Sequence, residues 1–172
     1  SEEEVLLKND SDLKGAQSKN LHILELPELD FLKTLIVNQF DIFKDDIMRW
    51  EDTDFKITTS WFTRTAPGRE GVYHAHNNTM YSGTFYFNNV EEATSMTFSM
   101  FNLSTSYLIQ PTEFNNWNCT SWSFAGKNNE CIYFPSNLPH IIDRNTSNKI
   151  RYSLAFNITP IGTIGFDDSQ NV

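Results

Sequence analysis

Residues 149–159 read Lys149-Ile150-Arg151-Tyr152-Ser153-Leu154-Ala155-Phe156-Asn157-Ile158-Thr159. The stretch is mostly apolar between positions 150 and 158, and neither Gly nor Pro interrupts it. Aromatic and β-branched residues favour extended backbone, so the stretch predicts a β-strand.

Shorter runs rich in Thr, Phe, Tyr, Ile and Trp lie between residue 50 and this strand. Pro-Gly, Asn-Asn and Gly-Lys-Asn-Asn segments separate them and favour turns. The runs predict strands at 56–64, 71–76, 80–87, 95–101, 106–109, 120–124, 131–134 and 140–143. Many short strands separated by turns indicate a β-sandwich or jelly roll rather than a parallel α/β sheet.

One helix is predicted before the strands, at residues 27–49. Pro27 suits a first helical position, Glu28 and Asp30 suit the first turn, and apolar residues recur at helical spacing up to Ile47. We expect this amphipathic helix to cover an outer face of the sheet. The whole chain, 1–172, is interpreted as one domain, with an irregular lead-in at 1–20, a jelly-roll core at 56–160 and a polar tail at 166–172.

Composition limits the classes of partner. The net charge is -9 and there are only 13 Lys and Arg residues, which argues against nucleic-acid binding. No apolar run is long enough to cross a bilayer, and the acidic start does not resemble a secretory signal, so we expect a cytoplasmic protein with no membrane partner. Cys119 and Cys131 lack the spacing of a zinc or redox motif and are expected to stay reduced.

Three of the four histidines fall in two stretches. His74 and His76 are two residues apart, so on a strand their side chains share a face. His140 follows Phe134-Pro135-Ser136-Asn137-Leu138-Pro139, a Pro-bracketed turn that enters a later strand. Three converging imidazoles predict a metal site. The alternative is that these histidines bind no metal and are surface or core residues satisfied by ordinary hydrogen bonds.

The pattern departs from the usual non-haem iron site of two histidines and one carboxylate, because His76 stands where the carboxylate would be. Either His76 is the third ligand, or a nearby group such as Asn78, a water or an unplaced carboxylate takes that role.

Arg151 and Ser153 share a face of the 149–159 strand. A guanidinium and a hydroxyl make a good clamp for a carboxylate. An inward Arg on an apolar strand needs an anion, which is either an internal Asp or Glu or a small bound dicarboxylate. The position one strand beyond His140 favours the dicarboxylate.

These stretches together resemble the 2-oxoglutarate and Fe(II)-dependent oxygenases, and more narrowly a small family of oxygenases from phages of marine cyanobacteria and some bacteria. The resemblance covers most of the chain. It rests on Ser60-Trp61, on His74-Ala75-His76 followed by Tyr81-Ser82-Gly83-Thr84-Phe85-Tyr86-Phe87, on Phe134 to His140, and on Arg151-Tyr152-Ser153-Leu154-Ala155-Phe156-Asn157.

The resemblance implies a double-stranded β-helix with Fe(II) and 2-oxoglutarate as cofactors. His74 and His140 would be iron ligands, His76 would fill the third position, and Arg151 with Ser153 would hold the distal carboxylate of 2-oxoglutarate. The implied reaction uses oxygen to hydroxylate a substrate, which related enzymes find on a prolyl or other peptidyl side chain. Trp61 and Tyr81 are the candidates for substrate contact, although each is equally well interpreted as a packing residue.

Two other functions remain open at this stage. One is a cupin-like metalloenzyme that uses three histidines without 2-oxoglutarate. The other is a non-catalytic jelly roll that binds carbohydrate or caps a virion structure through its aromatic residues.

Overall fold

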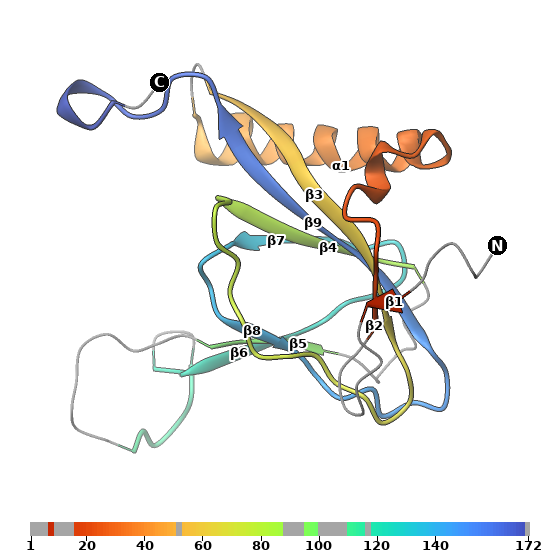
Figure 1. Cartoon of the computed structure of the whole chain (residues 1–172). Helices are drawn as coiled ribbons and strands as arrows, with labels where there is room; N and C mark the ends of the chain where they lie inside the picture. Colours follow the sequence, from red (N-terminus) through yellow and green to blue (C-terminus); the bar gives the residue numbers. More distant parts are fainter. Residues whose placement is uncertain are drawn as a thin grey trace.

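Two antiparallel β-sheets face each other in the computed structural model, which describes residues 7–8, 16–50, 53–87, 95–99, 110–115 and 118–170 (Figure 1). The larger sheet has the strand order β1-β2-β3-β9-β4-β7 and the smaller has the order β6-β5-β8. The bounds are β1 Leu7–Lys8, β2 Ala16–Ser18, β3 Asp54–Thr65, β4 Tyr81–Tyr86, β5 Ser95–Ser99, β6 Ser121–Ala125, β7 Cys131–Pro135, β8 His140–Ile142 and β9 Arg151–Ile161. The predicted jelly-roll class is confirmed.

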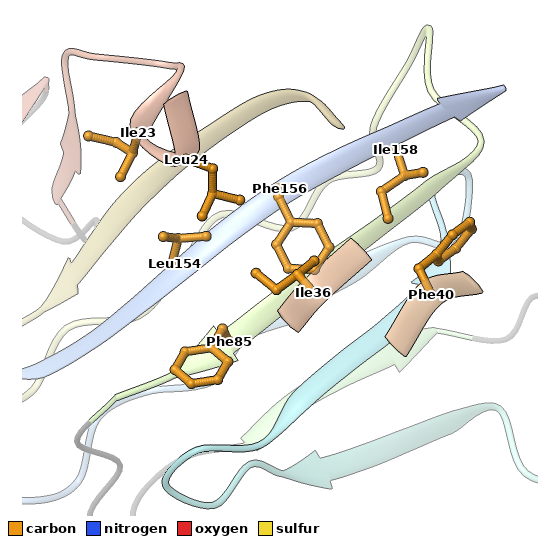
Figure 2. Close-up of a cluster of buried hydrophobic side chains, with 8 residues drawn as sticks. All are labelled: Ile23, Leu24, Ile36, Phe40, Phe85, Leu154, Phe156 and Ile158. Carbon is orange, nitrogen blue, oxygen red and sulfur yellow. The ribbon is translucent and has the colours of Figure 1, made fainter. Parts of the chain in front are cut away.

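Strand β9 lies in the middle of the larger sheet, between β3 and β4. Its side chains alternate between the two faces of the sheet. Leu154, Phe156 and Ile158 belong to the hydrophobic core on the outer face (Figure 2). Ala155 lines a cavity between the two sheets, and the other odd-numbered residues of β9 share its face. The strand therefore supplies the core with one set of residues and the interior of the barrel with the other.

The helix covers the outer face of the larger sheet, as predicted (Figure 1). It consists of α1 (Asp30–Ile42), a preceding 3₁₀ turn (Pro27–Leu29) and a following π-helical turn (Phe43–Met48) that ends at Arg49 in the left-handed conformation. Ile36 and Phe40 are its buried residues and point into the core cluster (Figure 2). The Tyr133 hydroxyl of β7 donates to the carbonyl oxygen of Ile36 at 2.9 Å, which ties the helix to the sheet.

Three predictions of secondary structure need correction or fall outside the described residues. The expected irregular lead-in contains β1 and β2, because Ala16 and Gln17 pair with the open edge of β3 at Arg64 and Thr63. The expected strand at 71–76 is only an isolated bridge, since its backbone bonds to β8 and to Ser136 do not form a continuous ladder. The expected strand at 106–109 lies outside the described residues.

Two further observations concern membrane-spanning helices and the cysteines. Within the described ranges, no helix has both the length and the apolar character needed to cross a bilayer. Cys119 and Cys131 are both free thiols, and burial raises the pKa of the Cys131 thiol to about 12.

Candidate metal centre

The three predicted histidines come together between the sheets. His74 and His76 lie on the connection between β3 and β4, and His140 is the first residue of β8. A nitrogen of each ring lies within 4.8 Å of a nitrogen of each of the others. Backbone hydrogen bonds hold them there. The amides of His74 and His140 each donate to the carbonyl of the other, at 3.0 and 2.9 Å, and the His76 amide donates to the Ser136 carbonyl at 2.8 Å.

Hydrogen bonds fix which nitrogen of each ring carries the proton. His74 Nδ1 lies 2.6 Å from the Val72 carbonyl and His140 Nδ1 lies 3.0 Å from the Leu138 carbonyl. His76 Nδ1 lies 2.8 Å from the Asn157 side-chain oxygen Oδ1. Because these oxygens can only accept, each Nδ1 is the donor, and Nε2 is left with its lone pair free.

Two of these lone pairs face each other. His74 Nε2 and His76 Nε2 are 3.2 Å apart, close to the roughly 3 Å between neighbouring ligands of an octahedral ion at bond lengths of about 2.1 Å. Without a cation or proton between them the two lone pairs repel. The ligand nitrogens of the three rings lie within 4.8 Å of one another, so a small adjustment brings all three to bonding distance of one ion. The donor set therefore fits a divalent metal with three imidazole ligands.

Burial keeps the inner two rings neutral. It lowers the pKa of His140 to about 4, with smaller contributions from His74 and His76. It also lowers the pKa of His76, helped by His74 and opposed by the bond to Asn157. Neutral imidazole is the form that binds metal, so both rings are ready to bind near neutral pH.

Arg151 is buried, with 2% of its surface exposed, at the start of β9. Its Nη2 donates to Thr65 Oγ1 at 3.2 Å, and it forms no ion pair among the residues that the structure describes. Burial lowers the pKa of the guanidinium, and its electrostatic interactions with Tyr86 and Asp143 only partly offset this. No carboxylate among the described residues forms an ion pair with this buried guanidinium, and a buried charge of this kind favours an anion as its partner.

A cavity of about 270 Å³ lies between the sheets beside the histidines. All three histidines line it, as does Thr65, the partner of Arg151. Neither Arg151 nor Ser153 is among the residues that line it. Both are buried on β9, where they pair with the lining residues Thr65 and Thr63 of β3. The remaining lining residues are Gln17, Trp61, Thr63, Gly71, Val72, Gly83, Thr84, Met96, Phe134, Ile142 and Ala155.

The two aromatic residues predicted to contact substrate have different positions. Trp61 lines the cavity, and its ring stacks on that of His76 at 5.8 Å. Tyr81 packs on the opposite face of the larger sheet, with its ring 5.6 Å from Phe40 and 5.4 Å from Phe43. The structure therefore does not bring Tyr81 to the cavity, and its contacts favour the packing interpretation.

Sequence reasoning gave no role to three residues at the site. Gln17 was assigned to an irregular lead-in, although it lies on β2 and lines the cavity. Thr65 and Asn157 contact Arg151 and His76. Asn157 could have been noticed, because it shares a strand face with Arg151 and Ser153, whereas the contacts of Gln17 and Thr65 depend on pairing between distant strands.

Comparison with known proteins identifies a family for this chain. A sequence model for the family described as "Putative 2OG-Fe(II) oxygenase" matches residues 59–157, more than half of the chain. The chain belongs to this family. It is accordingly an oxidoreductase whose cofactors are Fe(II) and 2-oxoglutarate. No curated protein matches the chain significantly in sequence.

Solved structures share the fold at low sequence identity. An oxidoreductase of the 2OG-Fe(II) oxygenase family from Burkholderia pseudomallei is 11% identical, with a TM-score of 0.62 over 90% of this chain and 71% of its own. A prolyl-4-hydroxylase from Pseudomonas putida is 13% identical, with a TM-score of 0.59 over 91% and 78%. HygX from Streptomyces hygroscopicus, solved with nickel, 2-oxoglutarate and hygromycin B, is 9% identical, with a TM-score of 0.59 over 92% and 74%.

Proposed function

We propose that this oxygenase hydroxylates a peptidyl side chain of the prolyl type. His74, His76 and His140 are the proposed ligands of its iron. The observation that carries the metal centre is the convergence of the three imidazoles, in which His74 Nε2 and His76 Nε2 lie 3.2 Å apart. All three Nδ1 atoms are occupied by oxygen acceptors, so a shared cation is the partner that satisfies the Nε2 atoms.

Arg151 and Ser153 are the proposed clamp for the distal carboxylate of 2-oxoglutarate. Arg151 has no ion pair among the described residues, and Thr65 holds one of its Nη atoms against the cavity wall. Ser153 lies two residues further along the same face of β9 and is likewise buried. A guanidinium fixed in this way gives a carboxylate both charge and directed hydrogen bonds.

When bound, iron and 2-oxoglutarate supply the oxidative decarboxylation to succinate and carbon dioxide that is coupled to hydroxylation of a C–H bond. The chain contributes position and shelter. Trp61 and Phe134 flank His76, with ring centroids 5.8 and 6.4 Å away, and shield it from water.

The size of the cavity supports a substrate that enters only in part. Pockets that enclose a whole drug-sized ligand occupy about 300–1,000 Å³. The cavity here is about 270 Å³ and has to hold 2-oxoglutarate as well. The space left fits one side chain, and Val72, Tyr73 and His74, which are exposed next to it, offer a surface for the rest of a peptide.

We place the reaction in the cytoplasm, because reduced iron and the free thiols of Cys119 and Cys131 both suit a reducing compartment.

A succinate assay tests the cofactor site. Protein loaded with Fe(II) is incubated with 2-oxoglutarate and oxygen, and succinate is measured for wild type, Arg151→Ala and Arg144→Ala. Arg144 is exposed and serves as the matched arginine control. We expect Arg151→Ala to raise the 2-oxoglutarate requirement and Arg144→Ala to match wild type. Bound metal without any succinate would instead favour a three-histidine enzyme that does not use 2-oxoglutarate.

Mass spectrometry tests the substrate class. Proline-containing peptides and free proline are offered under the same conditions, and the gain of one oxygen atom is recorded. We expect hydroxylation of peptide and not of the free amino acid. Efficient hydroxylation of the free small molecule would contradict the proposed substrate and leave the cofactor assignment intact.

A further inference from the structure

Asn157 is the residue through which β9 reaches the metal centre. Its Oδ1 lies 2.8 Å from His76 Nδ1 and accepts a second hydrogen bond from Ser82 Oγ at 2.7 Å. Its Nδ2 donates to Thr59 Oγ1 at 2.9 Å. The carboxamide is therefore held at both ends, from β3 and from β4, with its oxygen toward His76.

The same network continues to the other side of His76. Ser82 Oγ also shares a hydrogen bond with Ser136 Oγ at 2.9 Å, and the Ser136 carbonyl accepts the backbone amide of His76 at 2.8 Å. Ser82 and Ser136 are buried, so water does not readily replace these bonds. Both the ring and the backbone of His76 are thus anchored to one polar cluster.

We infer that Asn157 is the positioning residue that makes His76 a metal ligand, a role that rests on the proposed metal centre. By accepting from Nδ1, its oxygen keeps the proton on that atom and directs Nε2 toward the ion. A carboxamide does this without adding negative charge, so all three donors remain neutral imidazoles. The hydrogen bond from His76 to Asn157 therefore explains how His76 can serve at the ligand position where a carboxylate is usual.

A structural role alone would predict something different. If Asn157 served only to satisfy Ser82 and Thr59, its loss would change the free energy of unfolding but not the affinity for metal. The test therefore measures metal binding directly, with Co(II) alone as the probe and with no turnover.

Co(II) is titrated into the full chain, and binding is followed by calorimetry and by visible absorption. We expect Asn157→Leu, which removes the acceptor, to weaken Co(II) binding about 10- to 100-fold, as loss of outer-sphere partners does elsewhere. Asn157→Asp, which keeps an acceptor, should bind at least as tightly as wild type. Asn145→Leu is the matched control and should bind Co(II) as wild type does, because it removes a buried carboxamide whose hydrogen bonds go to Thr65, Ser147 and Lys149 and not to a histidine.

Nuclear magnetic resonance of the histidine ring nitrogens gives a second readout that needs no variant to fold. In metal-free wild type, the His76 proton is expected on Nδ1. A proton on Nε2 overturns the inference, as does unchanged Co(II) affinity in a folded Asn157→Leu protein. Failure of wild type to bind Co(II) overturns the metal centre itself, so the two failures are distinguishable.

Discussion

The backbones of His74 and His140 form an isolated antiparallel bridge, in which each amide donates to the carbonyl of the other at 3.0 and 2.9 Å. The ring centroids of the two residues are 4.4 Å apart. The bonds that bring the rings together are therefore independent of the side chains, and a ring can be removed without removing the bridge.

His140→Ala should abolish tight metal binding while the fold persists, because the backbone bridge to His74 does not need the imidazole. We expect a loss of at least about 100-fold in Co(II) affinity, since removing a ligand costs more than removing one of its partners. Calorimetric titration measures the affinity, and circular dichroism checks the fold. His22→Ala is the control. His22 lies apart from the three histidines, so this variant should bind Co(II) as wild type does.

Arg151→Met should remove the thermal response to 2-oxoglutarate. In wild type loaded with redox-inert Ni(II), 2-oxoglutarate at 100 times its Kd should stabilise the fold by about 2.7 kcal/mol. The variant should show little shift in Tm at that concentration. Without ligand it should melt above wild type, because a buried charge with no ion pair among the described residues is replaced by an apolar side chain. An undiminished shift in the variant would rule out the clamp.

The metal-free protein should lose stability in acid through His140. Burial holds the pKa of His140 at about 4 in the folded state, below the ordinary value of 6.5. The unfolded chain therefore takes up the proton first, and the free energy of unfolding falls as the pH drops from about 6.5 toward 4. Urea unfolding of wild type and His140→Gln across this range measures it. The difference between the two should move in favour of the variant as the pH falls, and a constant difference would contradict the assignment.

Trp61 should report metal binding by fluorescence. Its ring stacks on His76 at 5.8 Å, close enough for a paramagnetic ion at the centre to quench it. Co(II) should quench part of the emission of wild type, and Trp61→Phe should lose most of that quench. Trp50→Phe should retain it, because Trp50 stacks on Phe55 among the aromatic residues that pack with the helix. Equal quenching in both variants would place the ion elsewhere.

Gly83→Ala should destabilise the sheet under α1. A Cβ at this position would lie 2.3 Å from the Phe156 ring and 2.8 Å from the Ile132 carbonyl oxygen. Phe156 is fully buried, so it has little room to give way, and we expect a loss of about 1–3 kcal/mol in the free energy of unfolding. Ser121→Ala, at an exposed position on β6, should stay within about 0.5 kcal/mol of wild type in the same denaturant titration.

Much of the fold could be predicted because strand and helix periodicity are local. The predicted strand at 149–159 corresponds to β9, Arg151–Ile161, and the predicted helix at 27–49 contains α1. The predicted lead-in was wrong for residues 7–8 and 16–18, since strands this short have no periodicity and exist only through pairing with neighbouring strands. The predicted strand at 71–76 was also wrong. The sequence there has strand-like periodicity, but its backbone forms only an isolated bridge and no continuous ladder.

For the site, the sequence by itself determined which residues could act together on one strand, as with Arg151 and Ser153, since that spacing follows from the extended backbone. Only the tertiary structure decided which face of each strand lies inside, and so separated Trp61 from Tyr81. It also brought His140 to His74, left Arg151 without an ion pair among the described residues and gave His76 the Asn157 oxygen. These relations depend on long-range pairing between strands, and a two-residue repeat carries no information about which strands pair.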